Sequence, residues 1–197
     1  MKRPARLIAL AAVLALSGCV APVGPVEVTR FRSPDPGALA PGTIAIEAAP
    51  GMDPSSLEYR SYAVAVARQL SLVGFSEQPA GPTRYVALIK LERATYRPGR
   101  NGGPVSVGLG GSTGNYGSGL GVGIGIDLSG PPPEMVETRL SVMIRDRASN
   151  RTQWEGRSAF AVRASSPLAG TQLGAAKMAE ALFKGFPGVS GETIQVR

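Results

Sequence analysis

The residue types that most often carry out chemistry in proteins are scarce in this chain. Its 197 residues include one cysteine, Cys19, and no histidine. A histidine-based triad, a Cys–His dyad and an ordinary zinc site are therefore excluded. The carboxylates are scattered, with no pair at a spacing that would force two of them together as in a glycosidase. Neither a Ser-x-x-Lys pattern nor a calcium-type cluster of Asp and Asn is present. We expect no catalytic residue, no metal and no cofactor.

Cys19 follows a segment with the layout of an export signal. Three basic residues, Lys2, Arg3 and Arg6, precede an apolar run from Leu7 to Leu16. About ten apolar residues span about 15 Å as a helix, which is half of the hydrocarbon core of a bilayer. The run is therefore typical of a signal peptide and too short for a membrane-spanning helix.

The end of that segment, Leu16-Ser17-Gly18-Cys19, resembles the bacterial lipobox. The resemblance implies that Cys19 receives a diacylglyceryl thioether, that signal peptidase II cuts before it, and that the new amine is acylated. Such acyl chains anchor a protein without a spanning helix. Val20 follows, where an Asp would resemble an inner-membrane retention signal. We expect an outer-membrane lipoprotein on the periplasmic side of a Gram-negative envelope; the alternative is a chance cysteine in an ordinary secretory signal.

The net positive charge of the chain indicates which binding partners to expect. Cleavage before Cys19 removes Lys2, Arg3 and Arg6 with no acidic residue, which lowers the net charge from +7 to +4. An exported lipoprotein meets little nucleic acid, so we expect no nucleic-acid partner. Anionic envelope ligands or an envelope protein are the candidate partners, beside the membrane reached through the lipid on Cys19. A solvated, mildly basic surface would give the same balance.

The pattern of apolar residues predicts a single α+β domain over residues 26–197, after a signal peptide at 1–18 and a lipidated tether at 19–25. Alternation with period two indicates strands, and apolar residues at three- and four-residue steps indicate helices. We expect two layers, a mainly antiparallel sheet with both helices packed on one face, and a Gly-rich hairpin insert. The expected strands are 26–31, 43–48, 85–93, 136–146 and 153–164, and the expected helices are about 54–73 and 168–186. Residues 193–196 could add a last edge strand or stay mobile.

The first predicted helix has clear boundary signals. Asp53 can cap it, and Ser55 with Glu58 matches a capping box. Tyr59 and Tyr62 fall on its apolar stripe, and we expect them in the core rather than in a binding site. On the second helix, the predicted stripe includes Leu173, Ala176, Ala179, Leu182, Phe183 and Phe186.

The segment 99–130 is the compositional anomaly, with 13 glycines in 32 residues. A phosphate-binding loop does not fit, because no lysine lies between Lys90 and Lys177 and no helix follows. Gly alternates with aliphatic residues on both arms, which predicts a hairpin with one bare face that a partner, another copy or a membrane could approach. The alternative is a flexible insert with no specific role. The candidate interaction residues are Val107, Leu109, Tyr116, Val122, Ile124 and Ile126.

Arginines mark a second candidate surface. Arg139, Arg145, Arg157 and Arg163 alternate with the apolar residues of the two predicted strands at 136–146 and 153–164. They are therefore expected on the outer face of the sheet, where they could form a basic surface for anionic ligands. An ordinary solvated sheet face would show the same pattern.

Several short motifs resemble those of a family of bacterial envelope lipoproteins, the domain of unknown function 4136 family. The resemblance covers residue 26 to about 196 and rests on the order of the motifs after the lipobox: Val28-Thr29-Arg30-Phe31, Leu72-Val73-Gly74-Phe75, Asp146, Trp154-Glu155-Gly156-Arg157 and Ala181-Leu182-Phe183-Lys184-Gly185-Phe186-Pro187. It implies an α+β outer-membrane lipoprotein and no catalytic residues.

The sequence therefore favours a non-enzymatic interaction or structural module of the cell envelope. Two alternatives stay open. One is an envelope hydrolase that uses Asp and Glu alone, and the other is a self-assembling lipoprotein whose Gly-rich hairpins join between copies, which would make it a homo-oligomer.

Overall fold

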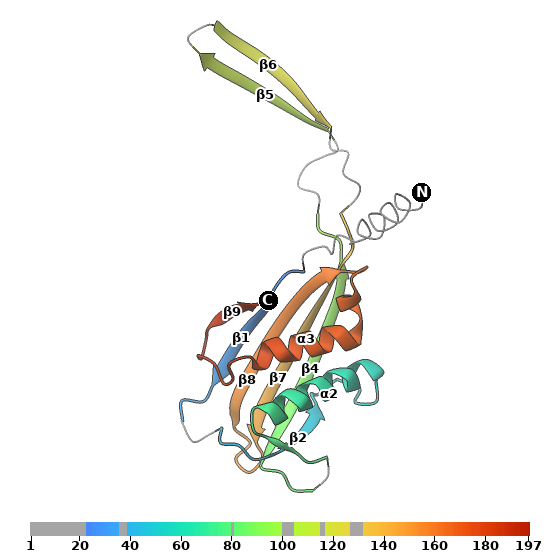
Figure 1. Ribbon diagram of the computed structural model, residues 1–197, viewed down its shortest axis with the longest axis vertical. Helices are drawn as coiled ribbons and strands as arrows, with labels where there is room; N and C mark the ends of the chain where they lie inside the picture. The colour runs from blue at the N-terminus through green and yellow to red at the C-terminus, as the bar shows by residue number, and fades with distance from the viewer. Residues whose placement is uncertain (1–22, 36–38, 80, 100–104, 115–116, 127–131) are drawn as a thin grey trace, which may run out of the picture.

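A computed structural model describes residues 23–35, 39–79, 81–99, 105–114, 117–126 and 132–197. Within 105–126 it describes the backbone alone. The elements follow the order expected from the sequence, with one short extra strand (Figure 1). They are β1 (Val26–Arg32), β2 (Thr43–Ala48), α2 (Leu57–Leu72), β3 (Ser76–Glu77), β4 (Tyr85–Tyr96), β5 (Val105–Gly114), β6 (Gly117–Ile126), β7 (Met135–Asp146), β8 (Thr152–Arg163), the 3₁₀ turn η1 (Pro167–Ala169), α3 (Thr171–Phe183) and β9 (Thr193–Val196).

Seven strands form one sheet in the order β3-β2-β4-β7-β8-β1-β9. The pairs β4–β7, β7–β8, β8–β1 and β1–β9 are antiparallel, whereas β2 runs parallel to β3 and β4. The parallel pair follows from the connection, because α2 carries the chain back from the end of β2 to the start of β4. Since β4, β7 and β8 each have 12 residues, they form the long centre of the sheet.

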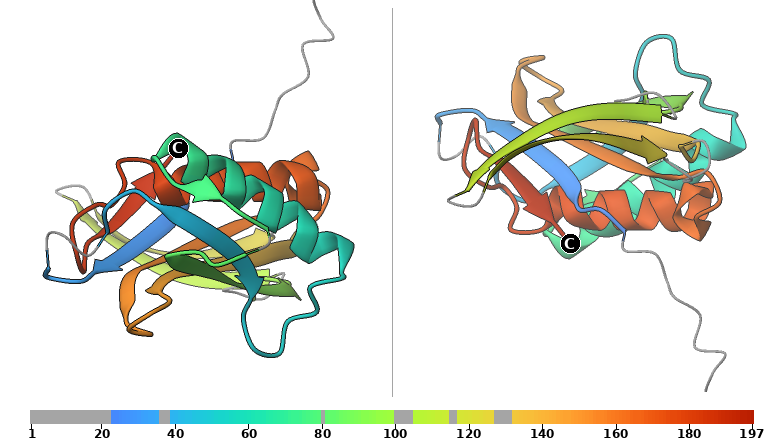
Figure 2. Two further views of the ribbon diagram at one scale, coloured as in Figure 1. Left: turned by 90° about the horizontal axis from the view of Figure 1, so that it is seen from below. Right: turned by 90° about the horizontal axis from the view of Figure 1, so that it is seen from above.

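Both helices cover the same face of the sheet, as Figure 2 shows from two directions, and the core lies between the two layers. Its largest fully buried side chains include Trp154, Tyr62, Tyr85 and Ile44. The predicted α+β fold, mainly antiparallel with two helices on one face, is confirmed. The other face of the sheet, which neither helix covers, is called the open face below.

The helix boundaries differ in detail from those expected. Ser56, not Asp53, is the N-cap of α2, and its hydroxyl accepts a hydrogen bond from the amide of Tyr59 at 3.0 Å. Asp53 instead accepts one from the amide of Ser55, which shapes the preceding turn. Tyr59 and Tyr62 are buried in the core as expected.

The second helix is shorter than predicted, and two residues of its expected apolar stripe, Leu173 and Ala176, are wrong because both are exposed. A 3₁₀ turn occupies its expected first turn, and α3 itself ends at Phe183. Leu173 is 56% exposed and Ala176 is exposed as well, whereas Ala175 and Met178 are buried together with the predicted Ala179 and Leu182. The helix packs against α2 as well as against the sheet, so its buried stripe is rotated relative to the simple periodic pattern.

The turn between β7 and β8 predicts a dependence of stability on pH. The amide and hydroxyl of Ser149 each donate to Oδ1 of Asp146 at 2.8 Å. These hydrogen bonds lower the pKa of Asp146 from its usual 3.8. A lowered native pKa adds stability above the unfolded-state pKa, and that stability is lost as the pH falls through the native pKa.

We therefore expect Asp146→Ala to be less stable than the wild-type protein at neutral pH. The difference should shrink on acidification and disappear once the pH lies below the lowered native-state pKa, where the carboxyl group is protonated in both states. Urea unfolding of both proteins across this pH range is the measurement. A difference that stays constant down to the lowest pH would show that the carboxylate charge has no part in it.

The strands β5 and β6 pair with each other in a separate two-stranded ribbon. Val105 lies opposite Ile126, Val107 opposite Ile124, and Leu109 opposite Val122, whereas Gly108 faces Gly123 and Gly110 faces Gly121. Because directly opposed residues lie on the same face of an antiparallel ribbon, this register puts the aliphatic positions on one face and glycines on the other.

Candidate interaction surfaces

A buried arginine holds β1 and the C-terminal end of α3 together. Arg30 is 5% exposed. Its guanidinium donates to the carbonyl oxygens of Leu182, Ala181 and Lys184 at 2.9, 3.1 and 2.7 Å. Those carbonyls have no partner within the helix, and a cation suits the negative end of the helix dipole. Burial lowers the pKa of Arg30, and the carboxylate of Glu192 partly offsets this.

An aromatic cluster lies beside this arginine. The ring centroid of Trp154 lies 5.3 Å from that of Phe183 and 5.1 Å from that of Phe186, and its indole N–H donates to the carbonyl of Pro187 at 2.9 Å. Phe75 meets Phe186 edge to face at 6.1 Å. Four of the five motifs of the family resemblance therefore meet at one place, where Arg30, Phe75, Trp154 and Phe186 contribute to the packing of the fold.

Gly156 is required for this packing. A Cβ atom at this position would overlap with Cη2 of Trp154 and would lie 2.8 Å from Cδ1 of Leu182. Trp154 and Leu182 are both fully buried. The glycine in Trp154-Glu155-Gly156-Arg157 is thus explained by the close approach of the indole ring to the strand.

A shallow groove of about 350 Å³ crosses the open face of the sheet. Two of the predicted arginines, Arg139 and Arg157, lie in it on neighbouring strands, and both are exposed. The groove is completed by Glu27, Thr29, Glu92, Ser141, Ser158 and Ala159. This surface combines paired charges with hydroxyl groups on a flat sheet.

The charges on the open face are balanced along each strand. Arg139 pairs with Glu137 at 2.8 Å, Arg157 pairs with Glu155 at 2.6 Å, and Lys90 pairs with Glu92 at 2.6 Å. Each pair is two residues apart on one strand, which puts both partners on the same face. The surface expected to be basic is therefore a row of ion pairs. Such exposed pairs contribute little stability, so their side chains are free to exchange partners.

Arg163 lies away from this groove, at the end of the sheet where β1 and β7 begin and β4 and β8 end. This end is called the tether end, and Figure 1 shows it at the top of the seven-stranded sheet. A pocket of about 660 Å³ opens there. It is lined by Val23, Gly24, Met135, Ala161, Val162, Arg163, Ser165, Ser166, Pro167 and Leu168.

One row of residues crosses the open face at this end. Tyr96 on β4 is the register partner of Met135 on β7, and Met135 is the partner of Arg163 on β8. Val23 lines the same pocket as Met135 and Arg163. Tyr96 and Val23 are 41% and 40% exposed. We call Val23, Tyr96, Met135 and Arg163 the terminal row.

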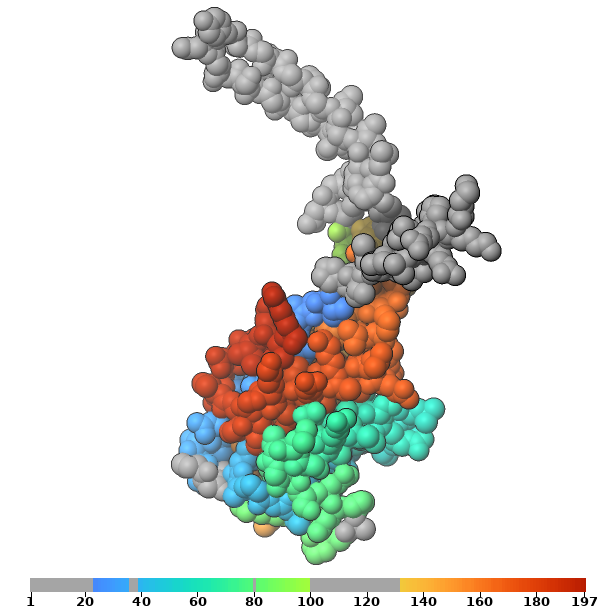
Figure 3. All heavy atoms as spheres, viewed as in Figure 1, coloured from blue at the N-terminus to red at the C-terminus, as the bar shows by residue number. Residues whose placement is uncertain are grey.

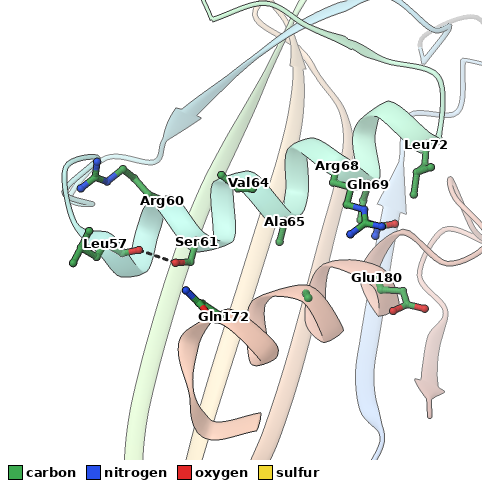
Figure 4. A pocket seen from close by; sticks show the side chains of 11 residues that line it. Leu57, Arg60, Ser61, Val64, Ala65, Arg68, Gln69, Leu72, Gln172 and Glu180 are labelled. Carbon is green, nitrogen blue, oxygen red and sulfur yellow. Dashed lines mark hydrogen bonds between the residues drawn. The ribbon is translucent and has the colours of Figure 1, made fainter. Parts of the chain in front are cut away.

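The helix layer carries a longer groove of about 1000 Å³ (Figure 4). Leu57, Val64 and Leu72 of α2 project into it and are at least 70% exposed, and Gln172 and Glu180 of α3 form its other side. The two helices lie side by side at the surface of the molecule, as the space-filling view in Figure 3 shows. This groove was not predicted from the sequence. Its signal is a second apolar stripe on α2, offset from the buried one.

Two of the predicted site residues, Cys19 and Tyr116, lie outside the described residues. Val107, Leu109, Val122, Ile124 and Ile126 are described by their backbone alone, in the ribbon register given above. Val23 and Leu168 at the tether end were missed, because an apolar residue in a loop has no periodic pattern around it.

The ionisable groups of the described residues show no metal centre. No group of three or more His, Cys, Asp or Glu that could hold a metal ion occurs among them. Hydrogen bonds from Ser55 lower the pKa of Asp53, and the hydrogen bond and charge of Lys90 lower that of Glu92. Together with Asp146, these carboxyl groups are held in the ionised form. In the described part of the chain, no helix is both long and apolar enough to cross a bilayer.

Comparison with known proteins gives weak similarities. No protein-family model matches the chain. An uncharacterized protein from Zymomonas mobilis is 26% identical, over 88% of this chain and 80% of that protein. A PDZ domain protein from Parabacteroides distasonis is 11% identical with a TM-score of 0.47, and the match covers 96% of this chain and 42% of that structure.

A further solved structure, the PelC dodecamer from Paraburkholderia phytofirmans, is 15% identical with a TM-score of 0.40, over 80% of this chain and 96% of that one. At these identities and scores the matches carry no argument about function. The assignment of function therefore depends on the residues themselves.

Proposed function

We propose that this chain is a lipid-anchored periplasmic protein of the outer membrane, and that its α+β domain is a non-enzymatic interaction or structural module of the envelope. The observation that carries the proposal is Leu16-Ser17-Gly18-Cys19, which places the only cysteine of the chain directly after a basic and apolar signal segment. The thioether-linked diacylglyceryl group and the amide-linked acyl chain would hold the domain at the membrane, since each buried methylene contributes about 0.8 kcal/mol.

The position of the first strand supports this arrangement. Val26 is the first residue of β1, and β1 lies between β8 and β9 inside the sheet. Six residues therefore lie between Cys19 and the body of the fold. A tether of this length, with prolines at positions 22 and 25, keeps the domain next to the membrane surface while leaving its open face accessible.

The open-face groove is the interaction surface that fits this role. Arg139 and Arg157 are exposed and ion-paired with carboxylates on their own strands. An incoming anionic group on an envelope polymer or protein could replace the carboxylates of Glu137 and Glu155 and take up the bidentate geometry that guanidinium favours. The hydroxyls of Thr29 and Ser141 in the same groove add neutral hydrogen-bonding groups.

Membrane fractionation of cells that express the wild-type chain or Cys19→Ser tests the anchor. We expect the wild-type protein in the outer-membrane fraction and the variant in the soluble periplasmic fraction, because serine cannot form the thioether. Ser71→Thr is the control, since it changes an exposed residue of the mature domain and leaves both the thiol and the lipobox in place. Equal membrane association of wild-type protein and Cys19→Ser would overturn the proposal.

Crosslinking in intact cells tests the interaction surface. Arg139→Gln with Arg157→Gln removes both guanidinium groups of the groove, and Arg60→Gln with Arg68→Gln makes the same change of charge on α2. We expect the first pair of substitutions to abolish crosslinked products that the second pair leaves unchanged. If the two variants give the same products, the open face is not the surface that binds.

A further inference from the structure

We propose that the tether end of the domain contacts the phospholipid bilayer directly, through the terminal row and the aliphatic face of the β5–β6 ribbon. This inference rests on the proposed lipid anchor for the direction in which the domain faces. It goes further by naming the surface that meets the membrane and the chemistry of its partner, an anionic phospholipid surface.

The first argument is reach. Three residues lie between Cys19 and Val23, and an extended chain spans about 3.5 Å per residue, so the four steps from Cys19 to Val23 reach at most about 14 Å. Val23 lines the pocket at the tether end. A lipid on Cys19 therefore holds this end, and not the opposite end with the β7–β8 turn, close to the bilayer.

The second argument is the chemistry of the terminal row. Tyr96 and Val23 are exposed, and Arg163 beside them is exposed as well. Arg97 follows Tyr96 and is also exposed. A tyrosine flanked by arginines and small apolar groups is the combination found where proteins meet the headgroup region of a membrane. Arginine near an anionic surface is attracted to its phosphates.

The third argument is the place of the ribbon in the fold. The chain leaves the sheet for β5 after Tyr96 and returns from β6 before Met135, and these two residues are register partners in the terminal row. The ribbon is thus inserted at the tether end. Its register puts Val105, Val107, Leu109, Val122, Ile124 and Ile126 at positions on one face. A two-stranded ribbon is marginal alone in water, and a bilayer interface supplies the apolar surface that it lacks.

Vesicle flotation of the mature chain carrying Cys19→Ser tests this proposal without the lipid. Large vesicles of phosphatidylethanolamine and phosphatidylglycerol are the probe, and phosphatidylcholine vesicles are the neutral reference. We expect the protein to float with the anionic vesicles and less with the neutral ones. Arg163→Gln should weaken binding about fivefold, whereas Arg151→Gln, the same change near the opposite end, should have no effect.

The ribbon is tested with two matched double variants in the same protein. Leu109→Asp with Val122→Asp adds two charges on the aliphatic face, and Gly110→Asp with Gly121→Asp adds two charges on the glycine face of the next register pair. The first should reduce bound protein by at least about tenfold, as expected from the loss of two buried aliphatic groups, and the second should reduce it much less. Circular dichroism of each variant checks that the sheet is folded.

Single-cysteine labelling gives an independent measurement, because Cys19 is the only cysteine in the chain and is absent from this variant. An environment-sensitive fluorophore on Val107→Cys should shift to the blue on anionic vesicles, and one on Ser149→Cys in the β7–β8 turn should not. The proposal would be overturned if the unlipidated protein failed to float with anionic vesicles. It would also be overturned if both ribbon variants lost vesicle binding equally, or if the ribbon produced a dimer that did not bind vesicles. A failed anchor would show instead in fractionation of the lipidated form.

Discussion

Replacing Arg30 with methionine should lower the free energy of unfolding by about 3 kcal/mol. The substitution removes a buried cation that donates hydrogen bonds to three carbonyls at the end of α3. Methionine keeps most of the aliphatic stem, so the change isolates the loss of the guanidinium. The carbonyls of Ala181, Leu182 and Lys184 would lose the donor that satisfies them. For a domain of this size such a loss corresponds to a fall in Tm of about 6–12 °C.

Arg32→Met is the matched control for this substitution. Arg32 lies two residues further along β1 and is exposed, so its replacement should change stability by less than about 0.5 kcal/mol. Arg30→Lys should fall between the wild-type protein and Arg30→Met, because an ammonium keeps the charge but cannot reach three carbonyls as a planar fork does. Thermal and urea unfolding measure all three, and equal effects at positions 30 and 32 would refute the role of Arg30.

Gly156→Ala should be nearly as damaging, with a loss of about 3 kcal/mol from overpacking. The added methyl group would overlap the indole of Trp154 and lie 2.8 Å from Leu182. The indole has no room to withdraw, since it stacks on Phe183 and hydrogen-bonds to Pro187. Gly24→Ala makes the same chemical change where no atom lies within 4 Å, and it should leave stability nearly unchanged.

A double-mutant cycle identifies the contact. In the background Trp154→Phe, which has a smaller ring, Gly156→Ala should cost at least about 1 kcal/mol less than it does in the wild-type background. If the penalty is the same in both backgrounds, the clash is not with the indole. Urea unfolding of the four proteins provides the measurement.

The sequence predicts most of the fold because its apolar spacing is regular. Val136 to Asp146 alternates cleanly and forms β7, and the stripe of Tyr59, Tyr62, Val66 and Leu70 forms the buried face of α2. The boundaries are less well predicted. Ser56 and Asp53 are both good caps, and which one caps α2 depends on the path of the preceding turn.

The tertiary role of Arg30 was not predicted, although the sequence carries a signal for it. Val26, Val28 and Arg30 alternate on β1, and all three are buried. An arginine on the same face of a strand as buried valines indicates a buried guanidinium, which needs hydrogen-bond acceptors. Its acceptors lie more than 150 residues away in α3, and this pairing depends on the packing of the whole domain.

The candidate surfaces were predicted in part. The period-two spacing predicted Arg139 and Arg157 outside the core, and both are exposed in the structure. Their ion pairs with Glu137 and Glu155 were not predicted, although each glutamate lies two residues from its arginine on the same strand. The terminal row combines β4, β7, β8 and the segment before β1. Strand order and register determine such a row, and a single sequence does not contain them.

The lipid on Cys19 is tested by the mass of the N-terminal peptide of the mature protein purified from membranes. We expect a peptide that begins at Cys19 and carries the added mass of a diacylglyceryl group and an amide-linked acyl chain. A mature N-terminus at any other residue, or Cys19 with a free thiol, would contradict the proposed lipid anchor.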